Sequence, residues 1–92
     1  MMNARIIVKK PTRAETDRMV VQPITEYGVS TFELTKEAKK TCLILEGEAR
    51  ITHSGGVATI TAGDYVMLPN FMTSTWNVTS PIKMHVFMGA KR

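Results

Sequence analysis

The sequence has few of the features that mark secreted or membrane-spanning proteins. It contains one cysteine, Cys42, which cannot form an internal disulfide, so nothing indicates an oxidising compartment. No stretch approaches the roughly 20 apolar residues that cross a bilayer. The apolar run at residues 6–8 is too short for a signal peptide. We therefore expect a cytoplasmic protein without a membrane partner.

The chain also lacks a concentration of charge of one sign. Residues 1–46 carry eight Lys or Arg against six acids and residues 47–92 carry four against two, so each half contributes +2 to the net charge of +4. Binding to nucleic-acid phosphates needs bases gathered on one face, and motifs that read DNA grooves or stack RNA bases are missing. We expect no nucleic-acid partner.

Complete catalytic motifs are absent as well. The sequence has no glycine-rich phosphate loop, no nucleophile elbow and no paired-histidine motif. Its two histidines, His53 and His85, cannot form a metal site by themselves. The motifs therefore do not indicate an enzyme.

What the sequence contains is typical of one small β domain. The 92 residues are 43% hydrophobic and 22% charged, which is ordinary globular composition. Short β-branched and aromatic runs alternate with glycine and proline turns, at about the 8–12-residue spacing of β-sandwiches and barrels. The predicted strands are residues 5–8, 29–35, 41–45, 50–52, 57–60, 65–68, 73–79 and 82–88.

Local signals predict how these strands begin, bend and end. Thr12 and Glu15 have capping-box spacing, which predicts a short helical turn through about Met19. Gly47 predicts a bulge or corner, and residues 53–56 predict a hairpin turn. The Ser-Pro pair at residues 80–81 predicts a break between the last two strands.

The chain is predicted to form one domain over residues 1–92. Residues 1–28 would supply an N-terminal strand, the short helix and a connection, and residues 29–88 the barrel core. Residues 42–45 and 65–68 are apolar at consecutive positions, so both faces of these strands should be buried. The N-terminal strand or a second subunit could cover the outer face, and for so small a domain we expect a homodimer.

Two motifs carry a resemblance to a known superfamily. Residues 41–47 read Thr-Cys-Leu-Ile-Leu-Glu-Gly, and residues 63–69 place five residues between Gly63 and Pro69. With the late segment 81–85, these motifs resemble the cupin superfamily, and within it the small single-domain cupins of the ureidoglycine aminohydrolase type. The resemblance spans about residues 29–87 and implies an all-β fold, the double-stranded β-helix or jelly-roll cupin barrel, with at most one short N-terminal helical turn.

At the metal-ligand positions this chain departs from the family pattern, so we expect that the barrel holds no metal and no other cofactor. Metal-binding cupins offer three histidines and a glutamate from these two motifs. The positions that correspond here are Lys40 for the glutamate, Ser74 for the last histidine, and, for the other two, Leu34 and Lys36 or, with a longer spacer, Glu33 and Thr35. An ammonium group in such a set repels a divalent cation.

Strand alternation and the resemblance together predict a ligand site inside the barrel. Lys40 and Cys42 share one strand face with Ile44, and Ser74 shares a face with Trp76 on a facing strand. An ammonium, a hydroxyl and an indole can hold a small anion with an apolar part. The candidate ligand-binding residues are Lys36, Lys40, Cys42, Ser74, Trp76 and His85.

Each candidate also has a purely structural interpretation. Lys36 and Lys40 could extend from the barrel mouth into water, with Trp76 in the core. Cys42 could be a nucleophile only if a base such as His85 lowered its pKa, whereas free cysteine is mostly a small buried hydrophobe. His85 lies in an apolar strand, where a hydrogen-bonded core or rim histidine is usual.

Three functions follow, in order of preference. The first is a metal-free cupin that binds a small polar or anionic molecule in the barrel. The second is a metal-independent enzyme related to ureidoglycine aminohydrolase, which rests on the resemblance alone, because a shared fold does not carry an activity. The third is a protein-interaction module that uses the outer apolar sheet.

Overall fold

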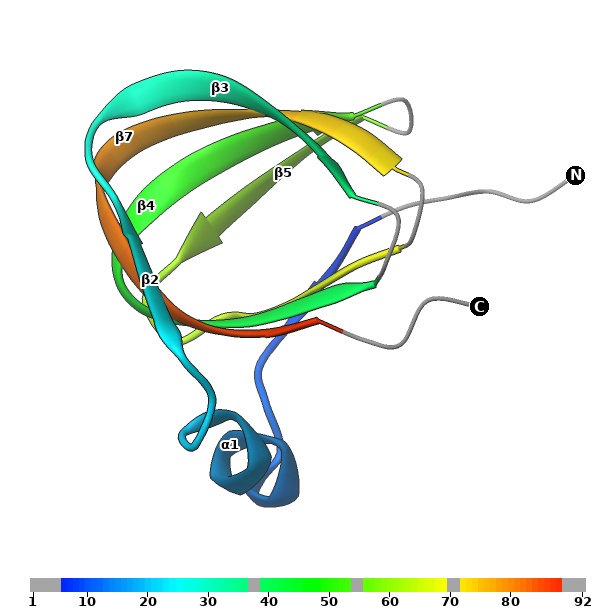
Figure 1. Ribbon diagram of the computed structural model, residues 1–92, viewed down its shortest axis with the longest axis vertical. Coiled ribbons are helices and arrows are strands. Elements are labelled where there is room, and N and C mark those ends of the chain that lie inside the picture. The colour runs from blue at the N-terminus through cyan, green and yellow to red at the C-terminus, as the bar shows by residue number, and fades with distance from the viewer. Residues whose placement is uncertain (1–5, 37–38, 54–55, 70–71, 89–92) are drawn as a thin grey trace, which may run out of the picture.

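The computed structural model describes residues 6–36, 39–53, 56–69 and 72–88, with the side chains of Lys36 and Met72 left out. These residues form seven antiparallel strands and one helix (Figure 1). In chain order the elements are β1 (Ile7–Lys9), α1 (Arg13–Met19), β2 (Ile24–Tyr27), β3 (Ser30–Lys36), β4 (Lys40–His53), β5 (Gly56–Thr61), β6 (Tyr65–Leu68) and β7 (Met72–Met88).

The two long strands, β4 and β7, build the barrel by pairing with different neighbours along their length. One stretch of the sheet has the order β1-β6-β4-β7-β2. In addition, β5 pairs with the second half of β4, and β3 pairs with the first half of β7. The strands curve around a common interior (Figure 1). This confirms the predicted all-β barrel with one short helix.

Alternation along these strands sends one set of apolar side chains inward. On β4 the buried set includes Cys42, Ile44 and Ile51, and on β7 it includes Trp76 and Met84, each with 1% or less of its surface exposed. They belong to one contiguous core cluster. Within each half of β4 the buried residues follow the period of two that predicted the strands, and the irregular register between Ile44 and Ala49 shifts this period by one residue.

β7 corrects the predicted break at residues 80–81, because it runs without interruption past Pro81. The opposing strand β4 shifts register on both sides of Gly47, whose φ is 93°. A Cβ at Gly47 would lie 2.6 Å from the carbonyl carbon of Pro81. The predicted bulge thus accommodates the proline, which cannot donate to a regular ladder.

The N-terminal segment covers part of the outer face of the sheet. The Thr12 hydroxyl accepts from the Glu15 amide at 3.1 Å and the Glu15 carboxylate accepts from the Thr12 amide at 2.8 Å, so the predicted capping box is confirmed. The helix α1 that follows buries Met19 against Leu43 and Tyr65 and lies outside the barrel (Figure 1). The structure thus assigns this cover to the helix, whereas the sequence suggested the N-terminal strand or a second subunit.

The remaining comparisons concern the predicted turns and one strand that was not predicted. The hairpin pairs His53 with Gly56, while residues 54–55 lie outside the described residues, as do 37–38 of the predicted loop and Asn70 of the predicted turn. β2, within the predicted N-terminal connection, was not foreseen and pairs with β7. Among the described residues, no helix is long and apolar enough to cross a membrane.

Candidate functional site

Four of the predicted ligand-binding residues lie together in the barrel interior. Lys40 is 4% exposed, Ser74 is 2% exposed, and Cys42 and Trp76 are fully buried. The Lys40 ammonium lies 5.4 Å from the centre of the Trp76 ring. The Trp76 indole N–H donates to the Ser74 hydroxyl oxygen at 3.1 Å. Within the described residues, Lys40 therefore points inward and not into water.

Two aromatic residues that the sequence analysis missed extend the Trp76 surface. The Tyr27 ring on β2 lies 6.2 Å from the Trp76 ring, and the Phe32 ring on β3 lies 6.0 Å from it in a stacked arrangement. Tyr27 and Phe32 also contact each other, with ring centres 4.8 Å apart. Phe32 could have been found, because it alternates with Leu34 in a predicted strand. Tyr27 gave no such signal, because its strand was not predicted.

The electrostatics of this interior hold the cysteine in its neutral form. Burial raises the pKa of the Cys42 thiol to about 11, and the nearby Lys40 ammonium only partly opposes this effect. Burial also raises the pKa of Tyr27, and the neighbouring Cys42 adds to the rise. A protonated thiol is a poor nucleophile, so the packing interpretation of Cys42 is the one the geometry supports.

His85 does not join these four residues. Its neighbour Met84 points into the barrel core, and alternation therefore turns His85 to the outer face of β7. There its Nδ1 lies 2.8 Å from the carbonyl oxygen of Gln22. A carbonyl can only accept, so Nδ1 carries the hydrogen and donates it. His85 thus ties the segment after α1 to the sheet, away from the interior site.

The remaining predicted residue, Lys36, is placed only by its backbone. It ends β3 opposite Met72 of β7, and its side chain is not described.

The residues at the positions of the metal-binding cupin motifs do not suit a divalent cation. Lys40 offers an ammonium, and the Ser74 hydroxyl oxygen already accepts a hydrogen from Trp76. Across the described residues, no group of three or more histidine, cysteine, aspartate or glutamate side chains is placed to hold a metal ion.

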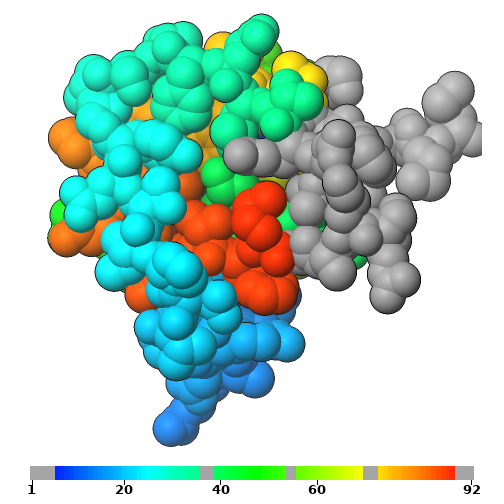
Figure 2. Space-filling view, in the orientation of Figure 1, coloured from blue at the N-terminus to red at the C-terminus, as the bar shows by residue number. Residues whose placement is uncertain are grey.

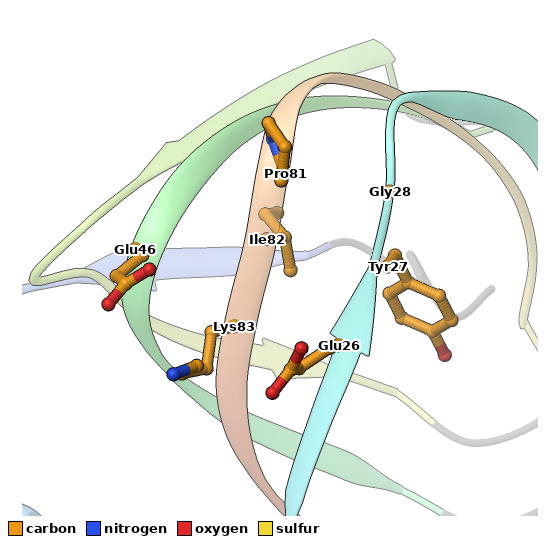
Figure 3. A pocket seen from close by; sticks show the side chains of 7 residues that line it. All are labelled: Glu26, Tyr27, Gly28, Glu46, Pro81, Ile82 and Lys83. Atoms are coloured by element: carbon orange, nitrogen blue, oxygen red, sulfur yellow. The ribbon is translucent and has the colours of Figure 1, made fainter.

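A separate hollow of about 330 Å³ lies on the outside of the barrel (Figure 3). Lys83 on β7 stands between Glu26 on β2 and Glu46 on β4, each directly opposite it in the strand register. The Tyr27 ring points away from these charged groups (Figure 3). The charged side chains of this hollow are cross-strand neighbours on a solvated face. Cross-strand pairing is enough to explain why they lie together.

Comparison with known proteins relates this geometry to a family. The profile of the EutQ-like cupin domain matches residues 14–85. A solved DUF861 family protein of Thermotoga maritima is 31% identical with a TM-score of 0.85, and the match covers 92% of this chain and 100% of that chain. No curated protein matches the chain.

Two further solved structures share the fold. A putative ethanolamine utilization protein Q of Salmonella typhimurium is 17% identical with a TM-score of 0.68, covering 75% of this chain and 56% of that one. A protein of unknown function (DUF1255) from Acidithiobacillus ferrooxidans is 22% identical with a TM-score of 0.65, covering 67% and 60%. The chain thus spans little more than half of each of these two larger proteins.

Proposed function

Since the chain belongs to the EutQ-like cupin domain family, we propose that it binds a small organic anion inside the barrel, without a metal ion. The fold is that of a cupin. The ligand and the absence of a metal are the proposal, and they rest on what this chain carries inside the barrel.

The observation that carries the proposal is the buried ammonium of Lys40. The side chain is 4% exposed and lies over the Trp76 ring, within a largely apolar core. A positive charge held beside an aromatic ring in a low-dielectric interior attracts negative charge more strongly than it would in water. The position of Lys40 therefore favours an anion as the guest of the barrel.

The neighbouring side chains favour a ligand that is anionic at one end and apolar at the other. The Ser74 oxygen accepts from the Trp76 indole, so its own hydrogen can be donated to an oxyanion. Tyr27, Phe32 and Trp76 form an aromatic surface beside it. Carboxylates with a short aliphatic or aromatic tail match both features.

The chemistry of the same residues supports the proposal that no metal is needed. A cation at the family's metal position would meet the Lys40 ammonium in a low-dielectric interior, where like charges repel strongly. Without a metal, this chain also lacks the usual means by which cupins activate water. An activity related to ureidoglycine aminohydrolase therefore stays an alternative, and ureides belong in the test.

Thermal shift with a panel of carboxylates, ureides and divalent metal chlorides tests the proposal. At about 100 times its Kd, a bound carboxylate should stabilise the protein by about 2.7 kcal/mol, which raises Tm by roughly 10–20 °C for a domain this small. Lys40→Met should abolish the shift, whereas Lys83→Met, which changes a lysine on the outer face, should preserve it.

Two outcomes would contradict the proposal. One is an equal carboxylate shift in Lys40→Met and in the unchanged protein. The other is stabilisation by a metal with stoichiometric binding. A shift that a ureide produces without any metal would support the metal-independent enzyme instead.

A further inference from the structure

The outer face of the sheet carries two neighbouring rows of side chains that cross four strands. In one row, Lys9, Tyr65, Leu43 and His85 stand directly opposite one another on β1, β6, β4 and β7. In the next row, two residues further along each strand, the corresponding side chains are Ile7, Met67, Thr41 and Phe87. We call the second set the open row.

The helix α1 packs mainly on the first row, and Met67 of the open row touches the edge of the same cluster. Met19 packs on Leu43 and Tyr65, and the Glu15 carboxylate binds the Lys9 ammonium at 2.9 Å. The carbonyl of Gln22, just after the helix, binds His85. One row of this face therefore shows how a short helix packs on it.

The two ends of the open row are exposed among the described residues. Ile7 and Phe87, at its two ends, are 47% and 46% exposed. The space-filling view shows the C-terminal end of β7 at the surface beside the α1–β2 segment (Figure 2). Large apolar side chains at both ends of one row make it a candidate contact surface.

Two small hollows make the open row uneven and give it a charge. One, of about 150 Å³, is lined by Arg18, Met19, Thr41, Tyr65 and Phe87. The other, of about 160 Å³, is lined by Ile7, Lys39, Met67, Leu68 and Pro69. Each hollow thus contains one base, and neither has an acid among its described lining residues.

We propose that the open row binds a short acidic amphipathic helix of a partner protein, which lies beside α1. Four strands at about 4.8 Å spacing span about 14 Å, the length of roughly ten helical residues. The apolar side of such a helix fills the two hollows. Its carboxylates meet Arg18 in one and Lys39 in the other, which makes the two surfaces complementary in charge.

The same features disfavour the other occupants. A strip about 14 Å long and one helix wide, about 10 Å, is far smaller than the roughly 800 Å² per partner of a stable dimer. Anionic membranes are typically recognised by clusters of about four to eight bases, and the open row has only two among the described lining residues of its hollows. A second copy of the chain and a lipid surface are therefore outcomes that would overturn the proposal.

Fluorescence anisotropy with a designed peptide tests the binding. The probe is a labelled peptide of about 14 residues with leucines at helical spacing on one face and glutamates on the other. We expect micromolar binding that weakens with added salt. Replacing both Phe87→Ser and Ile7→Ser should weaken it about tenfold or more, and Arg18→Gln with Lys39→Gln should remove most of the salt dependence.

Controls separate a specific site from general stickiness. Val57→Ser, at a residue on β5 that is 59% exposed and outside the open row, should leave the peptide affinity unchanged. Circular dichroism confirms that each variant is folded. Equal binding of a lysine-for-glutamate peptide, loss of binding in Val57→Ser, or no binding at millimolar peptide would overturn the proposal. So would self-association, or binding to vesicles of phosphatidylglycerol, that Phe87→Ser abolishes.

Discussion

At the scale of single residues, Gly47 is the described glycine with the least room for a side chain. Its φ of 93° lies in the left-handed region, and a Cβ there would lie 2.8 Å from the Ile82 Cα and closer still to the Pro81 carbonyl. We predict that Gly47→Ala lowers the free energy of unfolding by about 3 kcal/mol or more, because backbone strain and a backbone clash add. Urea unfolding followed by the fluorescence of the single tryptophan measures this loss.

Gly28→Ala is the matched control for Gly47→Ala. A Cβ at Gly28 meets no atom within 4 Å, and its φ is not positive. Its free energy of unfolding should change by no more than about 0.5 kcal/mol. Equal losses in the two variants would show that the effect at Gly47 does not come from its contact with Pro81.

Cys42 makes stability depend on alkaline pH. Burial raises its pKa from 9.0 to about 11, so above about pH 9 the folded protein retains a proton that the unfolded chain releases. The contribution of the protonated Cys42 thiol to the free energy of unfolding is fully present below about pH 9. It is lost as pH rises through about 11. We predict that the unchanged protein loses about 2–3 kcal/mol more than Cys42→Ala over that range.

Urea unfolding of both proteins at each pH measures the difference. Ionisable groups that do not interact with Cys42 cancel in the comparison, whereas Tyr27, whose pKa Cys42 helps to raise, changes with it in Cys42→Ala. Parallel pH curves for the two proteins would show that the Cys42 pKa is not raised in the folded state.

Strand alternation predicted well which interior residues share a face. The residues that were missed lie where we did not apply it. Alternation placed Lys40 with Cys42 on one strand face and Ser74 with Trp76 on another, and the cupin resemblance predicted that these faces point into the barrel. The same rule sends His85 outward once Met84 is buried. Phe32 on β3 could have been found by the same alternation, whereas Tyr27 on β2 depends on long-range pairing with β7, which no local pattern contains.

At the scale of elements, local signals predicted where a helix or strand begins or bends better than they predicted whether a strand continues. The capping box, the Gly47 bulge and the bounds of β6 were correct. The break at Pro81 was wrong, because it ignored the compensating bulge on the opposite strand. β2 was missed because Pro23 and Gly28 bracket only four residues, too few for a visible period.

The capping box gives the prediction that belongs to α1. Thr12→Ala removes the hydroxyl that accepts from the Glu15 amide, and should lower the free energy of unfolding by about 1 kcal/mol. Because α1 covers Leu43 and Tyr65, the loss should extend to the whole fold and appear in tryptophan fluorescence. Thr12→Ser, which keeps the hydroxyl, should lose much less, and identical losses in both would contradict a capping role.

At the scale of the whole molecule, α1 changes the argument for a homodimer. A second subunit is not needed to cover Leu43 and Tyr65, since Met19 already does so. Large apolar side chains remain exposed where α1 leads into β2: Val20 at 50%, Val21 at 78% and Ile24 at 51%. A domain of this size gains much from burying such surface, so a dimer stays our prediction.

Sedimentation equilibrium at micromolar concentration checks the dimer and where it forms. We expect the unchanged protein and Phe87→Ser to be dimeric, because the open row is reserved for a partner helix. Val21→Asp should be monomeric, because burying a carboxylate in an apolar contact costs several kcal/mol. If the unchanged protein is a monomer at tens of micromolar, the dimer is refuted. If only Phe87→Ser is a monomer, the dimer contact lies at the open row.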